Sequence, residues 1–432
     1  MNEPNDKKNF AGTKNPSLFS ATITWAKIGF FSFGGPAAQI GLIHQITVIK
    51  KRWLTEKQFL DALSFCMLLP GPEAMQLATY IGWKLHRVLG GLIAGLLFVT
   101  PGALLILILS LSYAVAGTVG IFGSVLYGIK GAVVIIVLQA LIKLTTRTFS
   151  TAKQLSIGIF GFISIYIFNV QFPIIILIAA IIGSLGASNS SKKKVFYALP
   201  KTSQTLKLLF QWLAIWWSPI LVVDFIFGAQ LLAAIGYFFS KLAIVTFGGA
   251  YAVLAYMAQD IVEKFSWLNP IEMMDGLGLA ETTPGPLILV TEFVGFVTAF
   301  KSAGIWYGVG GATIALWATF VPCFLWIFVG APYLDWLTGQ PKLNAALSGI
   351  MAAVVGVITN LFVWFSIHVF FTETIRIKFA SLDFLVPNIS SFDPKIFFVA
   401  FICALMSIFL RLNLFWIIGV AALGGIFISK VF

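Results

Sequence analysis

Long apolar stretches separated by short polar segments run along the whole chain. Residues 92–115 and 412–432 are two examples, and each is long enough for a membrane-spanning helix, which needs about 20 apolar residues. The chain lacks the clean alternation of apolar and polar positions that marks the strands of a membrane barrel. The pattern therefore predicts an all-α polytopic membrane protein. Residues 1–17 are polar and have no cleavable apolar core, which predicts a short solvated tail.

Two of the apolar stretches are interrupted by residues that end helices. Residues 33–36 read FGGP, and residues 70–72 read PGP. Unpaired backbone groups at a break inside a bilayer are tolerated only where they are buried in protein or line a cavity. A helix that restarts after the break offers free N–H groups and the positive end of its dipole. The breaks therefore predict an anion-binding site near the middle of the membrane.

The second half of the chain repeats the first half. At an offset of 214 residues, residues 27–72 align without a gap to residues 241–286, and 15 of the 46 positions are identical. The identical positions include both glycines of FGG, a tryptophan, an aspartate and all of PGP. Weaker matches follow, such as 126-LYGIKGAVV-134 with 347-LSGIMAAVV-355. The chain is therefore predicted to be an internal duplication with a second pair of breaks.

Each copy is predicted to hold six membrane segments. In the first copy these are residues 18–48, 57–83, 87–115, 120–144, 153–168 and 171–187. A basic loop follows at 192–201, and then one unmatched apolar segment at 207–227. If that segment spans the bilayer, the second copy has the opposite orientation and the halves form an inverted repeat. The alternative is that it lies flat at the interface, as its tryptophans permit. The predicted domains are a tail (1–17), a first repeat (18–187), a loop with a linker helix (188–228) and a second repeat (229–432).

Charge is distributed unevenly between the halves. Hydrophobic residues make up 59% of the chain and charged residues 10%, and the net charge is +12. Residues 1–207 hold 19 Lys and Arg against 5 Asp and Glu, whereas residues 208–432 hold 9 against 11. Because cytoplasmic loops are enriched in basic residues, an inverted repeat explains this asymmetry without nucleic acid. The N-terminus is therefore expected in the cytoplasm and the C-terminus outside, in a cell membrane.

The same rule favours a folded-back path for the broken segments. If both broken segments of the first copy crossed the membrane fully, the basic stretch at 50–57 would lie outside. If they are re-entrant hairpins, that stretch stays in the cytoplasm with the other basic residues. Re-entrant hairpins at FGG and PGP are therefore expected.

Lys27 and Lys241 occupy equivalent positions seven residues before the first glycine of FGG, on the same helix face as that glycine. A lysine inside a membrane segment is costly and usually functional; the alternative is that it snorkels to an interface. Gln76 adds a neutral donor beside the first PGP. The predicted substrate-binding residues are Lys27, Gly34, Gly35, Gly71, Gln76, Lys241, Gly248, Gly249 and Gly285.

Three glutamates, Glu73, Glu281 and Glu292, lie in apolar surroundings. A carboxylate removed from water can take up and release protons near neutral pH, which makes all three candidates for coupling transport to a proton gradient. The alternative for Glu73 is that it caps the first turn of a restarted helix. The equivalent aspartates Asp61 and Asp275 are interpreted as structural.

These motifs resemble the chromate transporter (CHR) family over essentially the whole chain. The resemblance is carried by 27-KIGFFSFGGPAAQIGLIHQ-45, 66-CMLLPGPEAMQLATYIGWKLH-86, 241-KLAIVTFGGAYAVLAY-256 and 278-GLAETTPGPLILVTEFVGF-296. It implies a secondary transporter of the plasma membrane, with antiparallel halves, that expels chromate and confers chromate resistance. Sulfate is the expected competitor. Ala250 replaces Pro36 of the first copy, and Gln45 stands where many members have a basic residue.

Other readings of the sequence remain. The cradle would equally suit sulfate, molybdate or phosphate, and a passive anion channel would need the cradle without the glutamates. An enzyme is not expected, because His44, His86 and His368 are scattered and no catalytic motif occurs. The cysteines, Cys66, Cys323 and Cys403, lie far apart in apolar runs and are interpreted as buried packing residues. No cofactor or metal is expected, the partners are the oxyanion, protons and lipid, and a homodimer is left open.

Overall fold

The computed structural model describes residues 16–117, 120–185, 202–247, 250–379, 382–410, 412 and 414–431. Most of the predicted polar tail and the basic loop at 192–201 lie outside these ranges. The first half forms α1 (Leu18–Phe31), α2 (Gly35–His44), η1 (Gln45–Lys50), α3 (Glu56–Leu68), α4 (Glu73–Ala116), α5 (Gly120–Thr148), α6 (Ala152–Tyr166) and α7 (Phe172–Ser184).

The linker forms α8 (Thr202–Leu221) and η2 (Val222–Ile226). The second half then forms α9 (Gln230–Val245), α10 (Ala250–Ala258), η3 (Gln259–Lys264), α11 (Pro270–Thr282), η4 (Leu287–Leu289), α12 (Val290–Ala303), α13 (Ile305–Gly330), η5 (Ala331–Tyr333), α14 (Leu334–Thr338), α15 (Pro341–Phe370), η6 (Ile389–Ser391), α16 (Pro394–Ile408) and α17 (Leu414–Val431). Strands β1 (Thr374–Phe379) and β2 (Leu382–Pro387) lie between α15 and η6.

The helices are those of a multi-pass membrane protein. Five helical stretches of the described residues are long and apolar enough to cross a bilayer: Glu73–Ala116, Gly120–Thr148, Thr202–Ile226, Ile305–Tyr333 and Pro341–Phe370. Six shorter apolar helices accompany them. The expectation of an all-α membrane protein is therefore confirmed at this level.

The long helix α4 is two helices joined by a sharp turn. His86 and Arg87 leave the helical region, and Arg87 has a positive φ of 54°. Gly82 before the turn lies directly against Gly90 after it, so the two parts pack side by side. The part before the turn belongs to the PGP segment, and the part after it is the next long segment predicted from the sequence.

Two of the broken segments fold back on themselves. The ring of Phe65, before the first PGP, lies 5.9 Å from that of Tyr80 after it, tilted by 56°. The ring of Phe238, before the second FGG, lies 6.1 Å from that of Tyr256 after it. Helices that continued straight through these breaks would separate such pairs by many residues of helical rise. These two segments are therefore helical hairpins, and the described residues on either side of each break pack against each other.

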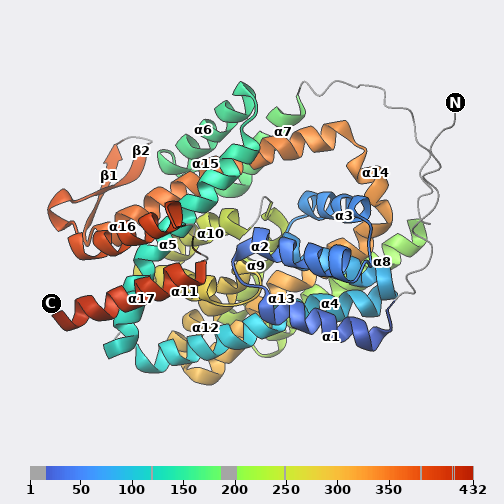
Figure 1. Cartoon of the computed structure of the whole chain (residues 1–432), viewed down its shortest axis with the longest axis horizontal. Helices are drawn as coiled ribbons and strands as arrows, with labels where there is room; N and C mark the ends of the chain where they lie inside the picture. Colours follow the sequence, from blue (N-terminus) through green and yellow to red (C-terminus); the bar gives the residue numbers. More distant parts are fainter. Residues whose placement is uncertain are drawn as a thin grey trace.

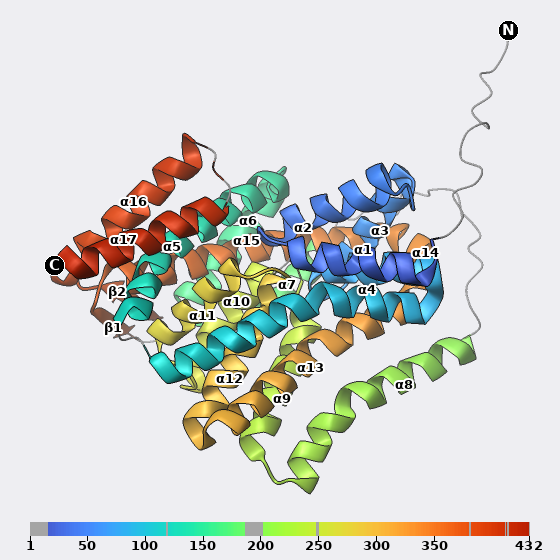
Figure 2. The same cartoon turned by 60° about the horizontal axis from the view of Figure 1, so that its bottom comes forward.

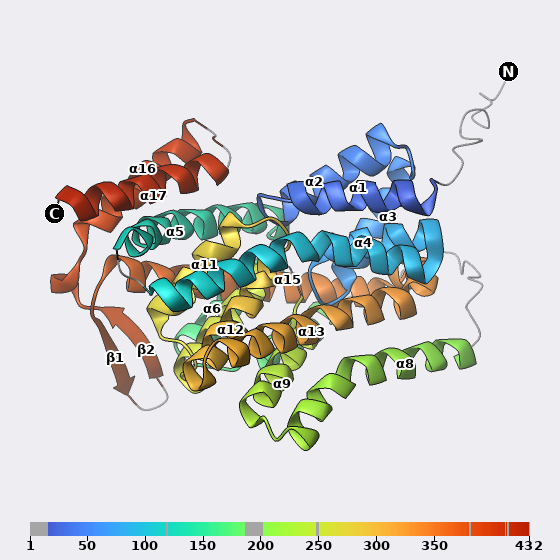
Figure 3. The ribbon, with the colours of Figure 1, turned by 90° about the horizontal axis from the view of Figure 1, so that it is seen from below.

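The two halves exchange their last helix pairs. Helices α6 and α7 of the first half pack along α15 of the second, while α16 and α17 of the second half pack along α5 of the first. Figure 1 shows α6 beside α15, and Figure 3 shows α16 and α17 over α5. Glycines permit the close contacts: Gly356 lies against Gly158, and Gly425 lies against Gly128.

The linker α8 lies along the outside of α13 and also contacts α9, at the edge of the molecule (Figure 2). Two of its tryptophans face the protein: Trp212 and Trp216 are buried, and the Trp216 indole donates to Ser240 Oγ at 3.1 Å.

A small β-hairpin lies between the helices α15 and α16, and the sequence did not predict it. Strands β1 and β2 pair antiparallel, with Thr374 opposite Pro387. In Figure 1 the hairpin lies at the end of the molecule that also holds the C-terminus, opposite the end where α8 begins. The first half joins the equivalent helices α5 and α6 by only three residues, Phe149–Thr151, so the repeat gave no signal for it.

Candidate functional site

Each PGP motif bonds to a described residue just before the FGG motif of the opposite half. The Gly71 N–H donates to the Thr246 carbonyl at 2.9 Å, and the Gly285 N–H donates to the Ser32 carbonyl at 3.0 Å. Both the donors and the acceptors are 214 residues apart, so these are two copies of one contact. The breaks leave backbone groups without helical partners, and each half supplies partners for the other.

Two buried glutamines complete this network. Gln39 Nε2 donates to the Gly285 carbonyl at 2.6 Å and to the Ser32 carbonyl at 3.2 Å. Gln76 Nε2 donates to the Pro70 carbonyl at 2.6 Å, while its Oε1 is buried without a partner among the described residues. Gln76 was predicted as a ligand donor, whereas Gln39 was missed. A polar residue just after the restart at Pro36 was the available signal.

The glycines of the tips are required by the backbone. Gly71 has a φ of 122° and Gly285 a φ of 92°, which other residues rarely adopt. Their amide hydrogens were predicted to face an anion. In this structure both are taken by the opposite half, so they hold the tips together.

A cavity of about 500 Å³ opens beside these tips. Its wall includes the start of α2, the start of α4, the end of α11, the second half of α5 and part of α15. The start of α2 is the notable element. Gly34 and Gly35 line the cavity, and no side chain caps this helix N-terminus. This helix N-terminus therefore faces open space with its positive end.

Two of the predicted glutamates line the same cavity. Glu73 stands at the first position of α4, and Glu281 stands in the last turn of α11. Tyr251 donates its hydroxyl to Glu281 Oε1 at 3.0 Å. Residues 208 positions apart in the sequence thus face one cavity. Glu292 is elsewhere: it does not line this cavity, and its Oε2 is buried without a hydrogen-bond partner among the described residues.

Two cations of α5, Lys143 and Arg147, also line the cavity, and both are exposed. They mark the end at which the cavity opens, beside Ser150 and Gln154. By sequence they belong with the cytoplasmic basic residues, and no motif assigns them to the site. Their spacing of four residues on one helix face was the signal that could have grouped them.

The two predicted lysines are not brought to the cavity. Lys27 is exposed on α1, and Lys241 is exposed on α9 with its Nζ 5.9 Å from the centre of the Tyr256 ring. Neither lines the cavity. Gly248 and Gly249 lie outside the described residues. The three cysteines are buried and unpaired, as the sequence predicted, and the described residues contain no group of three His, Cys, Asp or Glu that could hold a metal.

Comparison with known proteins gives a consistent result. The sequence model of a family described as "Chromate transporter" matches residues 19–184 and 233–426. A "Probable chromate transport protein" of Synechococcus elongatus is 29% identical over 80% of this chain and 83% of its own length. A "Chromate transport protein" of Cupriavidus metallidurans is 29% identical over 80% and 81%. An uncharacterised transporter of Methanocaldococcus jannaschii is 25% identical over 85% and 89%. No solved structure matches.

Proposed function

The chain belongs to the chromate transporter family, and we propose that it is a secondary transporter that exports chromate from the cytoplasm. The observation that carries the proposal is the composition of the central cavity. An uncapped helix N-terminus, two cations and two carboxylates face about 500 Å³ of space beside the helix breaks.

Chromate is a tetrahedral dianion, and the cavity offers it matching groups. The backbone N–H groups at the start of α2 supply directed donors and the positive end of the helix dipole. Lys143 and Arg147 supply two positive charges near the opening, where they attract the anion and bond to it. In this proposal they take the role that the sequence assigned to Lys27 and Lys241.

Glu73 and Glu281 couple the anion to protons in this proposal. Two ionised carboxylates would repel a dianion in the same cavity, whereas protonated ones would not. Binding of the anion therefore favours binding of protons, and release of one favours release of the other. In this scheme one proton leaves with the dianion and the second carboxyl keeps its proton, so one net negative charge moves and a membrane potential negative inside favours export.

We further propose that the halves form an inverted repeat with the N-terminus in the cytoplasm and the C-terminus outside. The exchanged contacts of Gly71 and Gly285, and two matches to one family model, support the repeat. The helix α8 is long and apolar enough to cross a bilayer and reverse the second half. The cavity then opens toward the cytoplasm, where Lys143 and Arg147 lie and where basic residues gather.

Two alternatives keep the same cavity. A carrier selective for sulfate or another tetrahedral oxyanion would use the same donors. A passive anion channel would use the cations but would not respond to a proton gradient. The two glutamates in the cavity favour the coupled carrier over the channel.

The test is chromate uptake into everted membrane vesicles. Vesicles that contain the protein should accumulate chromate saturably, sulfate or molybdate should compete, and collapse of the proton gradient should change the rate. Sulfate uptake unaffected by chromate would favour the sulfate carrier, and uptake indifferent to the gradient would favour the channel. Uptake no faster than in vesicles that lack the protein would reject the proposal.

A further inference from the structure

The cavity ends at a contact between the helices α11 and α5. Glu281, in the last turn of α11, and Ile136 of α5 both line the cavity. About one turn earlier on α11, Gly278 packs on Ile129 and Val133 of α5 so closely that a Cβ at Gly278 would lie 2.7 Å from Ile129 Cγ2. A larger residue at Gly278 would force Ile129 to move, and none of these three contact residues lines the cavity.

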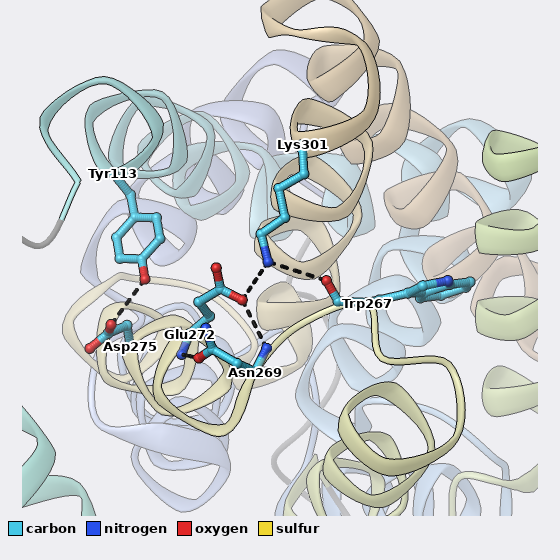
Figure 4. Close-up of polar contacts among 6 residues, drawn as sticks. All are labelled: Tyr113, Trp267, Asn269, Glu272, Asp275 and Lys301. Carbon is cyan, nitrogen blue, oxygen red and sulfur yellow. Dashed lines mark hydrogen bonds and ion pairs between the residues drawn. The ribbon is translucent and has the colours of Figure 1, made fainter.

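A buried ion pair clamps the same contact. Asp275 of α11 lies 3.0 Å from the Lys130 ammonium of α5, and its other oxygen accepts a hydrogen bond of 3.0 Å from the Tyr113 hydroxyl. The exposed fraction of the Asp275 side chain is 0%, and that of Lys130 is 13%. Figure 4 shows Tyr113 pointing at Asp275 from the neighbouring helix α4. Asp275 belongs to the second half, and both of its partners belong to the first.

The equivalent residues of the other half do not form such a clamp. Asp61 of α3 is the counterpart of Asp275, and it is exposed. Met351 of α15 is the counterpart of Lys130, and Met67 is the counterpart of Glu281; both methionines line the open cavity. Helix α3 packs on α4 and α14. The cavity is thus open beside the methionines of α3 and α15. It is closed between α11 and α5, where Asp275 and Lys130 form the ion pair.

We propose that α11 is the gate on the side of the cavity away from its opening, and that Lys130, Asp275 and Tyr113 form the latch that holds this gate shut. The inference of a gate rests on the proposed function, because a carrier must open its binding site to each side of the membrane in turn. Opening requires α11 to leave α5, which separates Asp275 from Lys130. These three are positioning residues that act through α11 and do not touch the oxyanion in the closed state.

A second ion pair on α11 provides a matched control. Glu272, one turn before Asp275, lies 2.5 Å from the Lys301 ammonium of α12. Both residues belong to the second half, and Figure 4 shows them separate from the Tyr113–Asp275 bond. Loss of this pair removes an ion pair from α11 without freeing α11 from the first half.

The first experiment locks the gate. The variant Ile129→Cys with Gly278→Cys places two Cβ atoms 3.8 Å apart, which suits a disulfide. The native cysteines are replaced by alanine, and cross-linking is followed by thiol counting. Oxidation should stop chromate uptake, and reduction should restore it, while the single-cysteine controls, Ile129→Cys alone and Gly278→Cys with Ile129→Ala, should ignore the oxidant. Uptake that continues in fully cross-linked protein would overturn the gate. Absence of uptake in wild-type vesicles would instead reject the transport function.

The second experiment releases the latch and needs no substrate. A cysteine replaces Val133 in the cysteine-free chain, and a membrane-impermeant maleimide is added on the face where Lys301 lies. Lys130→Met, which copies the other half, and Asp275→Asn should each raise the labelling rate at least tenfold. Lys301→Met should leave it unchanged. The double variant Lys130→Met with Asp275→Asn leaves no unpaired buried charge, so it covers the case in which a single variant fails to fold. An unchanged rate in the folded double variant would overturn the latch.

Discussion

Buried polar side chains supply hydrogen bonds to backbone groups at the centre of this molecule. Where a helix is broken, some backbone carbonyls lose their helical partners. Gln39 donates hydrogen bonds to two such carbonyls, one from each half. Loss of such a donor costs the desolvation free energy of a buried carbonyl that is left without a hydrogen bond. Gln39 is therefore expected to matter for stability even though it does not line the cavity.

The substitution Gln39→Leu tests this role. It keeps the approximate size of the side chain and removes both hydrogen bonds to Gly285 and Ser32, so stability should fall by about 1–3 kcal/mol. A lower thermal unfolding temperature in detergent would show the loss. Gln45→Leu, at an exposed position directly after the end of α2, should leave that temperature nearly unchanged. Equal temperatures for the two variants would contradict the role of Gln39.

Arg147 is the residue on which recognition of the anion can be measured. Arg147→Gln removes one charge from the cavity wall and should raise the KM for chromate about tenfold, equivalent to about 1.4 kcal/mol. Lys57→Gln is the control, because Lys57 is exposed at the same basic end of the chain but does not line the cavity. Uptake kinetics in everted vesicles provide the measurement, and a KM that shifts equally in both variants would count against the site.

Glu73 is the residue on which coupling can be measured. Glu73→Gln keeps a polar group in the cavity but cannot exchange a proton. Chromate uptake should persist, and its response to collapse of the proton gradient should become smaller, with Glu281 as the remaining carboxyl that exchanges a proton. Glu56→Gln, at an exposed position on α3, should keep the wild-type response. A gradient response as large as that of the wild type in Glu73→Gln would remove Glu73 from the coupling.

At the scale of elements, the hairpin tips depend on glycines that the backbone requires. A methyl group at Gly71 would meet Cys323 Sγ at 2.9 Å and Gln76 Nε2 at 2.8 Å, at a φ that alanine rarely adopts. The tips therefore combine a strained turn with close packing against the other half. The contact also occurs in the other half. Gly102 of the long helix α4 lies against Pro284 of the second PGP, just as Cys323 of the long helix α13 lies against Gly71 of the first PGP.

Gly71→Ala should consequently destabilise the protein by at least about 1–2 kcal/mol and strongly reduce transport. Gly41→Ala is its matched control, because a methyl group at Gly41 meets nothing within 4 Å and alanine favours the helix α2. The yield of folded protein after detergent extraction and the initial uptake rate are the measurements. A Gly71→Ala protein that is as stable and active as Gly41→Ala would refute the requirement.

The sequence predicted most of the helical elements because their signals are local or repeated. The six segments of the first half match α1 to α7 closely, with α4 shared between two of them. The linker segment at 207–227 is α8 with η2. The hairpin β1–β2 was missed, because it has no counterpart in the first half and its strands are short. Exchange of the last helix pairs was also missed, since packing partners far apart in sequence leave no periodic signal.

The candidate site was only partly predictable. Glu73, Glu281 and the glycines of the first FGG were named from helix breaks and buried charge, and they do line one cavity. Lys143 and Arg147 were not named, because they resemble ordinary basic residues at the end of a helix. Lys27 and Lys241 were named from their equivalence in the repeat, which indicates a shared position but not what that position faces.

At the scale of the whole molecule, the β-hairpin and the C-terminus lie at one end, and the linker α8 begins at the opposite end (Figure 1). In the proposed orientation the end where α8 begins is cytoplasmic. A single cysteine in place of Lys51 should therefore resist an impermeant maleimide in intact cells and react in everted vesicles. A cysteine in place of Ile389, in the exposed segment after β2, should behave in the opposite way. Labelling of the Lys51 position in intact cells would reverse or refute the folded-back topology.

The exchanged helix pairs also set the order in which the newborn chain can mature. Helices α6 and α7 leave the ribosome early, but the surface that receives them, on α15, is synthesised only near the end. Until then the glycine-containing faces of these helices contact lipid or a chaperone, and the first half cannot complete its packing alone. Folding of the protein therefore requires the full-length chain. A chain truncated before α15 is expected to be degraded by cellular quality control.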